Sequence, residues 1–417
     1  MKKYFDSRER STLKERKETQ DQALSSMVKQ GYKKSARLKK NLDTLKINPG
    51  KIRTREDLEI LPVISREKLV EMEMKDLPYA GLENPSIPID RIFTSPGPVY
   101  EPHLSETDYL WARAFFAAGI GPGDIALNAF SYHLVAAGLT FHNGLRKVGA
   151  TVVPSGTSSS QIQVQLIKDL KVTAYIGTPS FLMSIIDKSK ELGYNFKKDF
   201  RVKKACFAAE PLLPWLRQMF EKEHGIATYQ MYGATEVGDV AYECSRKSGW
   251  HICEETIVEI VDPSTGRNVA PGELGEVVVT RLNDIFFLLR FGTGDLSRLI
   301  TKKCSCGRTS YRLVGIAGRV GDAVKVRGLF IAPSQLKLLS SKFEGLPLQA
   351  VVSRKGHEDV LTMRLEKSNT QVGTNIWENN FKKLFKEICT VKIDVIQYVE
   401  AGTITADRKL ILDERQW

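Results

Sequence analysis

Short apolar runs alternate with segments of helical length through the middle of the chain, between residues 106 and 233. The apolar runs predict strands at 125–130, 150–154, 172–177, 202–208 and 227–232. The segments around them predict helices at 106–118, 134–148, 160–169, 180–192 and 214–224. Strands that are apolar throughout and separated by helices are typical of βαβ units, whose parallel sheet is buried on both faces. Ligands of such sheets bind at the carboxyl ends of the strands, so we expect functional residues there.

The pattern changes after about residue 240, where strands dominate. Apolar stretches at 257–261 and 275–281 are separated by a turn at Asp262-Pro263-Ser264-Thr265-Gly266. A second change at Gly321-Asp322 leads into a unit of mixed strands and helices. Its predicted strands are 324–326, 348–354, 359–365 and 391–398, and its predicted helices are one from Pro333 and one at 374–388. We therefore predict two domains, 1–320 and 321–417, with a hinge at Gly321.

Residues 1–45 are dense in Lys and Arg, with scattered Leu, Met and Tyr between them. This pattern favours amphipathic helices whose basic faces are solvated. A basic arm that binds RNA or a membrane is the alternative, but the aromatic residues are few and are not interleaved with the charges.

Composition and charge narrow the class of protein. Hydrophobic residues make up 42% and charged residues 26% of the 417 residues, which is typical of a folded globular chain and excludes a disordered one. The formal net charge of +12 favours anionic partners, such as nucleic acid, lipid headgroups, nucleotides or coenzyme A. No segment is typical of a nucleic-acid-binding motif, so we expect no nucleic-acid partner.

No apolar stretch is long enough for a membrane span, and the first residues lack the apolar region of a signal peptide. The six cysteines are too few for a disulfide framework, which leaves free thiols or a metal site. We therefore expect a cytoplasmic protein with no membrane partner. The sequence leaves the oligomeric state open, a homodimer included.

Four short motifs follow one another at the predicted strand ends and the predicted hinge. They are Ala208-Ala209-Glu210-Pro211, Tyr232-Gly233-Ala234-Thr235-Glu236, Thr293-Gly294-Asp295, and Gly318-Arg319-Val320-Gly321-Asp322 continuing to Lys325-Val326-Arg327-Gly328. In this order and at these separations they resemble the adenylate-forming superfamily of acyl-CoA synthetases, and specifically the phenylacetate–CoA ligase family. The segments 58–69 and 142–154 also resemble that family, so the resemblance covers the length of the chain.

The resemblance implies an α/β fold of the adenylate-forming type. This fold has a large N-terminal domain with parallel sheets and a β-rich subdomain, and a small mobile α+β C-terminal domain. It implies an ATP- and Mg²⁺-dependent ligase that activates a carboxylic acid as an acyl-adenylate and then forms a thioester with coenzyme A. Such a reaction requires the enzyme to hold the adenosine, neutralise phosphate charge and place two anions in line.

The resemblance also implies roles for individual residues. Adenine would lie against the backbone of Ala208, Ala209, Glu210 and Pro211, and against the ring of Tyr232 in the Tyr232-Gly233-Ala234 segment. Asp295 would accept hydrogen bonds from the ribose hydroxyls. Thr235 would donate to the α-phosphate, Glu236 would hold Mg²⁺, and Arg319 would contact ribose or phosphate. Each carboxylate or guanidinium has a simpler alternative as a turn residue, a helix-end charge or a surface ion pair.

Two segments depart from the family pattern. Where the family carries a Ser/Thr/Gly-rich phosphate loop ending in Gly-Lys-Pro, this chain has Thr94-Ser95-Pro96-Gly97-Pro98-Val99-Tyr100-Glu101-Pro102. Pro96 and Pro98 have no N–H to offer, so Thr94, Ser95 and Gly97 are the candidate phosphate ligands. Near the C-terminus, the segment that carries the family's catalytic lysine is shorter here. Lys409 is our candidate for that lysine, Arg408 is the fallback, and Lys325 would line the pantetheine channel.

Residues for the acid pocket are less distinctive. Phe130, Tyr132 and Gly138 lie where the family's acyl site begins, and small residues beside aromatic ones suit a flat ring. They favour an aryl or arylacetic acid, with ordinary helix packing as the alternative.

Cys244, His251, Cys304 and Cys306 have the spacing of a metal site. Cys304-Ser305-Cys306-Gly307 forms a Cys-x-Cys-Gly knuckle, and some members of the family are similar at these positions. Three thiolates and one imidazole make a closed tetrahedral set for a structural Zn²⁺. Buried free cysteines beside a surface histidine are the alternative.

Two other functions remain open from the sequence. One is adenylation with an acceptor other than coenzyme A, such as a carrier protein or a cofactor hydroxyl. The other is a nucleotide-binding homologue without turnover, which the altered phosphate loop and the shortened C-terminal segment both favour.

Overall fold

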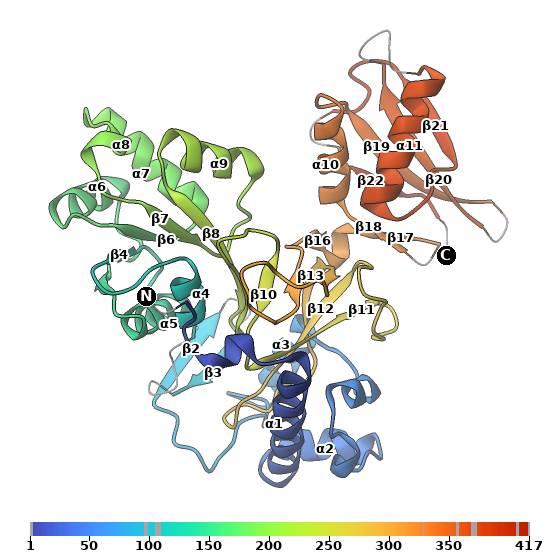
Figure 1. Ribbon diagram of the computed structural model, residues 1–417. Coiled ribbons are helices and arrows are strands. Elements are labelled where there is room, and N and C mark those ends of the chain that lie inside the picture. Colours follow the sequence, from blue (N-terminus) through green and yellow to red (C-terminus); the bar gives the residue numbers. More distant parts are fainter. Residues whose placement is uncertain are drawn as a thin grey trace. The chain divides into compact units, whose positions relative to one another are not determined.

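The computed structural model describes residues 3–95, 99–104, 110–327, 329–355, 358–367, 373–405 and 408–415 (Figure 1). Contact density divides the chain into two compact units. The first comprises 1–259, 278–293 and 300–314, and the second comprises 260–277, 294–299 and 315–417. None of the described helices is long and apolar enough to cross a membrane.

Amphipathic helices form the N-terminal part of the first unit, as the basic pattern of residues 1–45 predicts. Helix α1 (Leu13–Lys34) begins with a capping box in which Thr12 and Glu15 bond each other's backbone N–H groups. Helices α2 (Ala36–Thr44) and α3 (Arg66–Lys75) follow. Leu24 and Val28 of α1 are fully buried in a cluster with Phe287, which anchors α1 to the strand-rich part of the same unit.

A large sheet carries the alternating pattern of the middle of the chain. Its order is β14-β15-β10-β9-β8-β7-β6-β4-β5. Its parallel strands are β4 (Ile125–Asn128), β5 (Thr151–Val153), β6 (Ala174–Gly177), β7 (Lys204–Phe207) and β8 (Ala227–Ala234). The helices between them are α5 (Ala136–Lys147), α6 (Ser160–Asp169), α7 (Pro179–Glu191), α8 (Phe196–Asp199) and α9 (Pro214–Gln218), and α4 (Ala112–Ala117) precedes β4.

Both faces of this sheet are buried, as predicted. Ile176 packs in one core cluster and its neighbour Tyr175 in another, and both are fully buried. Two predicted helices differ in detail. The helix predicted at 214–224 is α9 followed by one π-helical turn at Met219–Glu223. The helix predicted at 106–118 begins only at Ala112 as α4, because Trp111 before it has a φ of 73°, and residues 105–109 lie outside the described part of the chain.

The large sheet continues in antiparallel pairs from β8 to β15, and β14 follows at the end of the order. The strands of this part are β9 (Gly238–Glu243), β10 (Trp250–Ile252), β15 (Arg312–Leu313) and β14 (Leu299–Ile300). A further sheet has the order β1-β13-β12-β11, with β16 beside β13. Its strands are β1 (Ile64–Ser65), β11 (Thr256–Val261), β12 (Gly275–Arg281), β13 (Phe291–Ser297) and β16 (Gly318–Arg319). A hairpin is formed by β2 (Arg91–Ser95) and β3 (Val99–His103).

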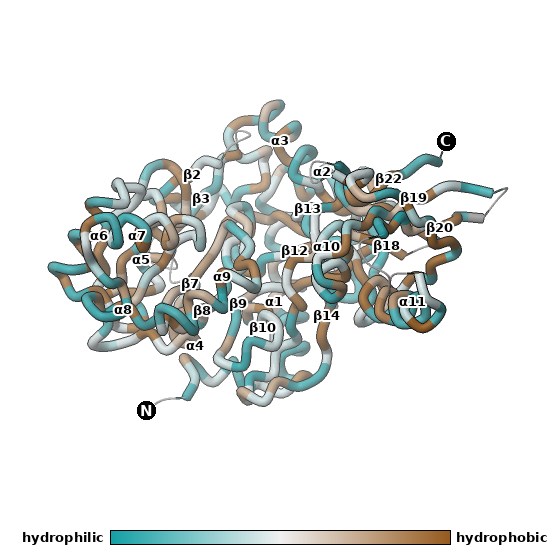
Figure 2. Tube along the Cα trace, turned by 90° about the horizontal axis from the view of Figure 1, so that it is seen from above, coloured by the Kyte–Doolittle hydropathy of each residue, from teal (hydrophilic) through white to brown (hydrophobic). Residues whose placement is uncertain are grey.

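The second unit contains the predicted C-terminal α+β fold. Its sheet has the order β21-β20-β19-β22, and β17 pairs with β18 separately. The strands are β17 (Val324–Val326), β18 (Leu329–Ile331), β19 (Leu348–Lys355), β20 (Glu358–Glu366), β21 (Val395–Val399) and β22 (Ile411–Asp413), and the helices are α10 (Pro333–Lys342) and α11 (Asn375–Cys389). In Figure 2, α11 carries both hydrophobic and hydrophilic colours around its turns. Its fully buried side chains Phe381, Phe385 and Cys389 recur every fourth residue, which is the spacing of one helix face.

The two units differ from the division that we predicted. Besides 315–417, the second unit includes the segments 260–277 and 294–299. The division into 1–320 and 321–417 with a hinge at Gly321 therefore stays a prediction. Gly321 lies in a short 3₁₀ turn (Val320–Asp322), and a Cβ there would meet no atom within 4 Å.

Candidate active site

Glu236 is held at the end of β8 in the first unit, where the chain turns toward β9. Its side chain is only 1% exposed, and it forms an ion pair with the guanidinium of Arg66. The hydroxyl of Thr235 donates to Glu236 Oε2 at 3.3 Å. Arg66 also donates from Nη2 to the hydroxyl oxygen of Ser95 at 3.2 Å. Three segments that are far apart in the sequence therefore meet around Arg66.

Arg66 has this position because it is the first residue of α3. Ser65 caps the helix by accepting a hydrogen bond from the N–H of Lys68, and Ile64 pairs with Phe291 of β13. Arg66 lies within the segment 58–69 that resembles the family, but sequence analysis assigned it no role. Its position in the first turn of a helix marks no function by itself, and its partner lies 170 residues away.

The β2–β3 hairpin brings a second carboxylate to the same place. Ser95 and Glu101 are 6% and 4% exposed, whereas Pro96, Gly97 and Pro98 lie outside the described residues. The N–H of Thr94 donates to the carbonyl of Leu134 at 2.9 Å, which fixes the hairpin to the loop before α5.

Burial perturbs two carboxylic acids beside Glu236. Burial raises the pKa of Glu101 to about 7, and the negative charge of Glu236 adds to the shift. Burial also raises the pKa of Glu73 to about 7, although the N–H of Tyr100 donates to Glu73 Oε2 at 2.9 Å. Sequence analysis missed both acids, because an isolated Glu in a strand or helix gives no sign of its burial.

A cavity of about 390 Å³ lies in the first unit, and Glu101, Thr235 and Glu236 form part of its wall. Trp111 and Phe286 contribute apolar surface to it. Arg113 also lines it and pairs with Glu255 at 2.7 Å. Burial opposes ionisation of Glu255, but the positive charges of Arg113 and Arg281 lower its pKa to about 2.

The predicted adenine segment follows β7. Ala208 is buried, and Ala209 has a φ of 69°, a conformation that turns the chain sharply after the strand. The carboxylate of Glu210 accepts a hydrogen bond from the Ser180 hydroxyl at 2.8 Å, which ties the segment, including Pro211, to the start of α7. These contacts fix the backbone that the family resemblance assigns to adenine.

Tyr232 lies buried in β8 of the same unit. Its hydroxyl donates to Thr293 Oγ1 at 3.2 Å, and its ring centre lies 5.7 Å from that of Trp250. The next residue, Gly233, lies close to the backbone of Gly238. A Cβ on residue 233 would come within 2.3 Å of the carbonyl oxygen of Gly238. A larger residue at 233 would therefore displace the turn that carries Ala234, Thr235 and Glu236.

Asp295 and Arg319 lie in the second unit and pair with each other. They are register partners on β13 and β16, and Arg319 Nη1 lies 2.7 Å from Asp295 Oδ1. Asp295 follows Gly294, whose φ of 72° suits glycine and whose N–H donates to Glu276 at 3.0 Å. The Arg319 side chain is 60% exposed, so its donors are accessible to an anion.

Lys409 and Lys325 also belong to the second unit. Lys409 is exposed just before β22, and its carbonyl accepts a hydrogen bond from Gln349 Nε2 at 2.7 Å. Arg408 is exposed beside it, and Lys325 is the central residue of β17. The roles of these three residues stay predictions.

The predicted acid-pocket residues gather at the carboxyl end of β4. Phe130 packs edge-on against Phe141, with ring centres 4.8 Å apart. The hydroxyl of Tyr132 accepts a hydrogen bond from Asn128 at 2.9 Å and lies 3.2 Å from Nδ1 of His142. Gly138 lies against the carbonyl of Ser131, where a Cβ would come within 2.2 Å, so its small size serves packing.

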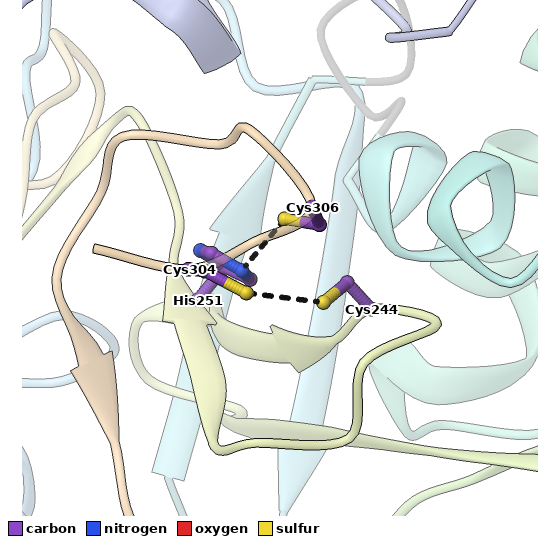
Figure 3. Close-up of side chains that lie close together, drawn as sticks. All are labelled: Cys244, His251, Cys304 and Cys306. Atoms are coloured by element: carbon purple, nitrogen blue, oxygen red, sulfur yellow. Dashed lines mark hydrogen bonds between the residues drawn. The ribbon is translucent and has the colours of Figure 1, made fainter. Parts of the chain in front are cut away.

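The four predicted metal ligands meet in the first unit (Figure 3). All four are buried, and their ligand atoms lie within 4.8 Å of one another. The Sγ atoms of Cys244 and Cys304 are 3.8 Å apart, and Cys306 Sγ is 3.4 Å from His251 Nε2. The other ring nitrogen of His251 lies 3.2 Å from the Ser310 hydroxyl, which orients the imidazole.

Comparison with known proteins first defines the class. Residues 104–283 match the family model of the AMP-binding enzymes. The structure is similar to that of a 2-hydroxyisobutyryl-CoA ligase in an open conformation, with a TM-score of 0.83, 22% identity and coverage of 98% of this chain and 93% of that one. The fold is therefore that of the adenylate-forming enzymes.

Sequence relatives then give the family. Phenylacetate–coenzyme A ligase of Thermus thermophilus is 30% identical over 364 residues, covering 84% of this chain and 81% of its own length. The Escherichia coli enzyme of the same name is 30% identical over 374 residues, covering 86% of this chain and 84% of its own length. The chain belongs to the phenylacetate–coenzyme A ligase family of adenylate-forming enzymes. It is therefore an AMP-forming acid–CoA ligase, which activates a carboxylic acid as an acyl-adenylate.

Proposed function

We propose that the protein activates an aryl or arylacetic acid with ATP and Mg²⁺ and transfers the acyl group to coenzyme A. The observation that carries the proposal is the buried carboxylate of Glu236 between Thr235 and Arg66, at the wall of a cavity. Carboxylate and hydroxyl oxygens are the donors that Mg²⁺ prefers, so these residues fit the ion. Bound Mg²⁺ supplies charge neutralisation at the phosphates of ATP.

The chain's own residues have separate tasks in this proposal. Arg66 pairs with Glu236 in the free enzyme and adds a positive charge at the site of the phosphates. Thr235 offers a hydroxyl to the α-phosphate, and Asp295 binds the ribose hydroxyls with Arg319 beside it. Lys409 bridges the attacking carboxylate and the α-phosphate, which lowers the charge repulsion between two anions.

The aryl preference is supported by the aromatic side chains beside the end of β4. Phe130 and Phe141 offer an edge-to-face pair that suits a third ring, and Tyr132 supplies a polar rim. The names of the relatives in Thermus thermophilus and Escherichia coli agree with an arylacetic acid.

Acid-dependent release of pyrophosphate from ATP tests the proposal. The assay compares phenylacetate, benzoate, 2-hydroxyisobutyrate and acetate, each with and without coenzyme A. We expect release with the aryl acids and a thioester when coenzyme A is present, and loss of both in Glu236→Gln. Turnover with aliphatic acids alone would refute the aryl pocket. Adenylate formation without a thioester would indicate another acceptor, and ATP binding without any release would indicate a homologue without turnover.

We also propose that Cys244, His251, Cys304 and Cys306 hold a structural Zn²⁺. Two sulfurs bound tetrahedrally at about 2.3 Å from zinc lie about 3.8 Å apart, and a sulfur and a nitrogen lie about 3.5 Å apart. The distances of 3.8 Å and 3.4 Å support this assignment. Four protein ligands leave no position for water, which fits a structural role. Metal analysis should find about one zinc per chain, and a value near zero would refute the site.

We infer a cytoplasmic location from the same chemistry. All six cysteines are free and buried, and the zinc ligands require thiolates that persist in a reducing compartment. ATP and coenzyme A, the proposed cosubstrates, fit that location.

A further inference from the structure

Glu101 is a buried carboxylate that the proposed reaction does not use. The residue is 4% exposed, and neither carboxylate oxygen has a hydrogen-bond partner among the described residues. An ionised carboxylate in such a position is costly unless a cation or hydrogen-bond donors compensate it. The nearby hydroxyls of Thr235 and Ser95 and the charge of Arg66 compensate it only in part, because the pKa of Glu101 stays raised to about 7, and this leaves a place for a cation from solution.

The neighbours of Glu101 add negative charge and no described ion pair. Glu236 and Glu73 are both buried, and one oxygen of Glu73 also lacks a partner in the described part of the chain. Arg66 donates to Oε1 of Glu236, and the Thr235 hydroxyl donates to the other oxygen, Oε2. Among the described residues, the charge of Glu236 therefore acts on both Glu73 and Glu101, and Arg66 pairs with Glu236.

The candidate ligand atoms here are all oxygens. Carboxylates from Glu101 and Glu236 and hydroxyls from Thr235 and Ser95 make a hard donor set, without sulfur or imidazole. Glu101, Thr235 and Glu236 share the wall of the 390 Å³ cavity, so a hydrated ion has room to enter. Mg²⁺ and Mn²⁺ suit such a set, because both keep several waters when two carboxylates bind them.

We propose that Glu101 and Glu236 together hold a divalent cation in the free enzyme, before any nucleotide binds. The cation would then already be in place when ATP enters, whereas a site with Glu236 alone depends on the phosphates for most of its affinity. The inference extends the Mg²⁺ role of Glu236 in the proposed function, but it concerns the nucleotide-free protein.

Titration of Mn²⁺ into nucleotide-free, zinc-loaded protein tests this directly. Free Mn²⁺ gives a sharp electron paramagnetic resonance signal that disappears on binding. We expect one site that Mg²⁺ displaces, and at least a tenfold weaker site in Glu101→Gln. Glu71→Gln, which makes the same change on the exposed face of α3, should bind Mn²⁺ as the unmodified protein does. Glu101→Asp keeps the charge on a shorter side chain, so its affinity for Mn²⁺ should lie between those of Glu101→Gln and the unmodified protein.

Two results would overturn the inference. One is the absence of a Mg²⁺-displaceable site in the unmodified protein, and the other is equal Mn²⁺ affinity in a folded Glu101→Gln. If Glu101→Gln does not fold, the unmodified protein and Glu101→Asp decide the question. Pyrophosphate release separates this inference from the proposed function. Acid-dependent release without Mn²⁺ binding by the free protein would refute only the cation site, and Mn²⁺ binding without release would refute only the ligase.

Discussion

Replacement of Arg290 by Met should destabilise the first unit more than almost any other single change of a charged residue. Arg290 is 1% exposed, and it binds Glu259, 6% exposed, through two parallel hydrogen bonds of 3.0 and 2.9 Å. Its third nitrogen donates to the carbonyl of Leu61, just before β1. Arg290→Met leaves the Glu259 carboxylate buried without its guanidinium, which costs about 3–5 kcal/mol of unfolding free energy.

Urea denaturation followed by circular dichroism measures this loss. A change of that size corresponds to a fall of roughly 6–20 °C in the thermal midpoint, at about 2–4 °C per kcal/mol. Lys75→Met breaks an ion pair whose side chains are 70% and 48% exposed, so its cost should stay below about 1 kcal/mol. The double variant Arg290→Met with Glu259→Met removes both charges and should recover most of the loss. A cost below about 1 kcal/mol for Arg290→Met, or no recovery in the double variant, would refute the reasoning.

Three further predictions concern the site, the metal and the response to acid. Thr235→Val should lower acid-dependent pyrophosphate release about 100- to 1,000-fold, because a hydroxyl donor to the phosphate is lost, and a steady-state assay that finds a change of less than threefold would argue against that role. Cys304→Ser should lose zinc by metal analysis and unfold at a lower temperature, whereas Cys206→Ala, which changes a buried free thiol in β7, should keep the metal. Because the folded-state pKa of Glu255 is about 2, below its ordinary value of 4.5, the stability that its pairing provides is complete above pH 4.5 and is lost as the pH falls toward 2. Glu255→Gln should therefore flatten the dependence of unfolding free energy on pH in that window, and an unchanged slope would show that other carboxylates cause the loss.

Much of the fold was predictable because its sheet is buried on both faces. Continuous apolar runs marked each parallel strand from β4 to β8 to within a few residues, and the same signal gave α6 and α7. The π-helical turn after α9 was missed, since nothing in the spacing of Leu216 and Phe220 separates it from an α-helix. The division at Gly321 stays a prediction, and the inclusion of the segments 260–277 and 294–299 in the second unit has no local signal in the sequence.

The site was predictable only where chemistry and motif coincide. The four Cys and His residues were predicted to lie together because soft donors at close spacing have few other uses, and the structure brings all four together. Arg66 and Glu101 escaped prediction for the opposite reason. Arginine and glutamate are common surface residues, and what distinguishes these two is the ion pair of Arg66 with the buried Glu236 and the burial of Glu101.

The position of Glu101 beside Glu236 also explains why the altered phosphate loop need not abolish the reaction. Two prolines remove N–H donors from the loop, and the chain places a carboxylate at Glu101 where the family pattern has a lysine. A negative charge there opposes phosphate binding when it stands alone, but it favours phosphate binding when it holds a divalent cation. The loop therefore lacks a fixed positive charge and has a second carboxylate, and these two changes are consistent with each other. Together they transfer the neutralisation of phosphate charge from a side chain to a bound metal ion.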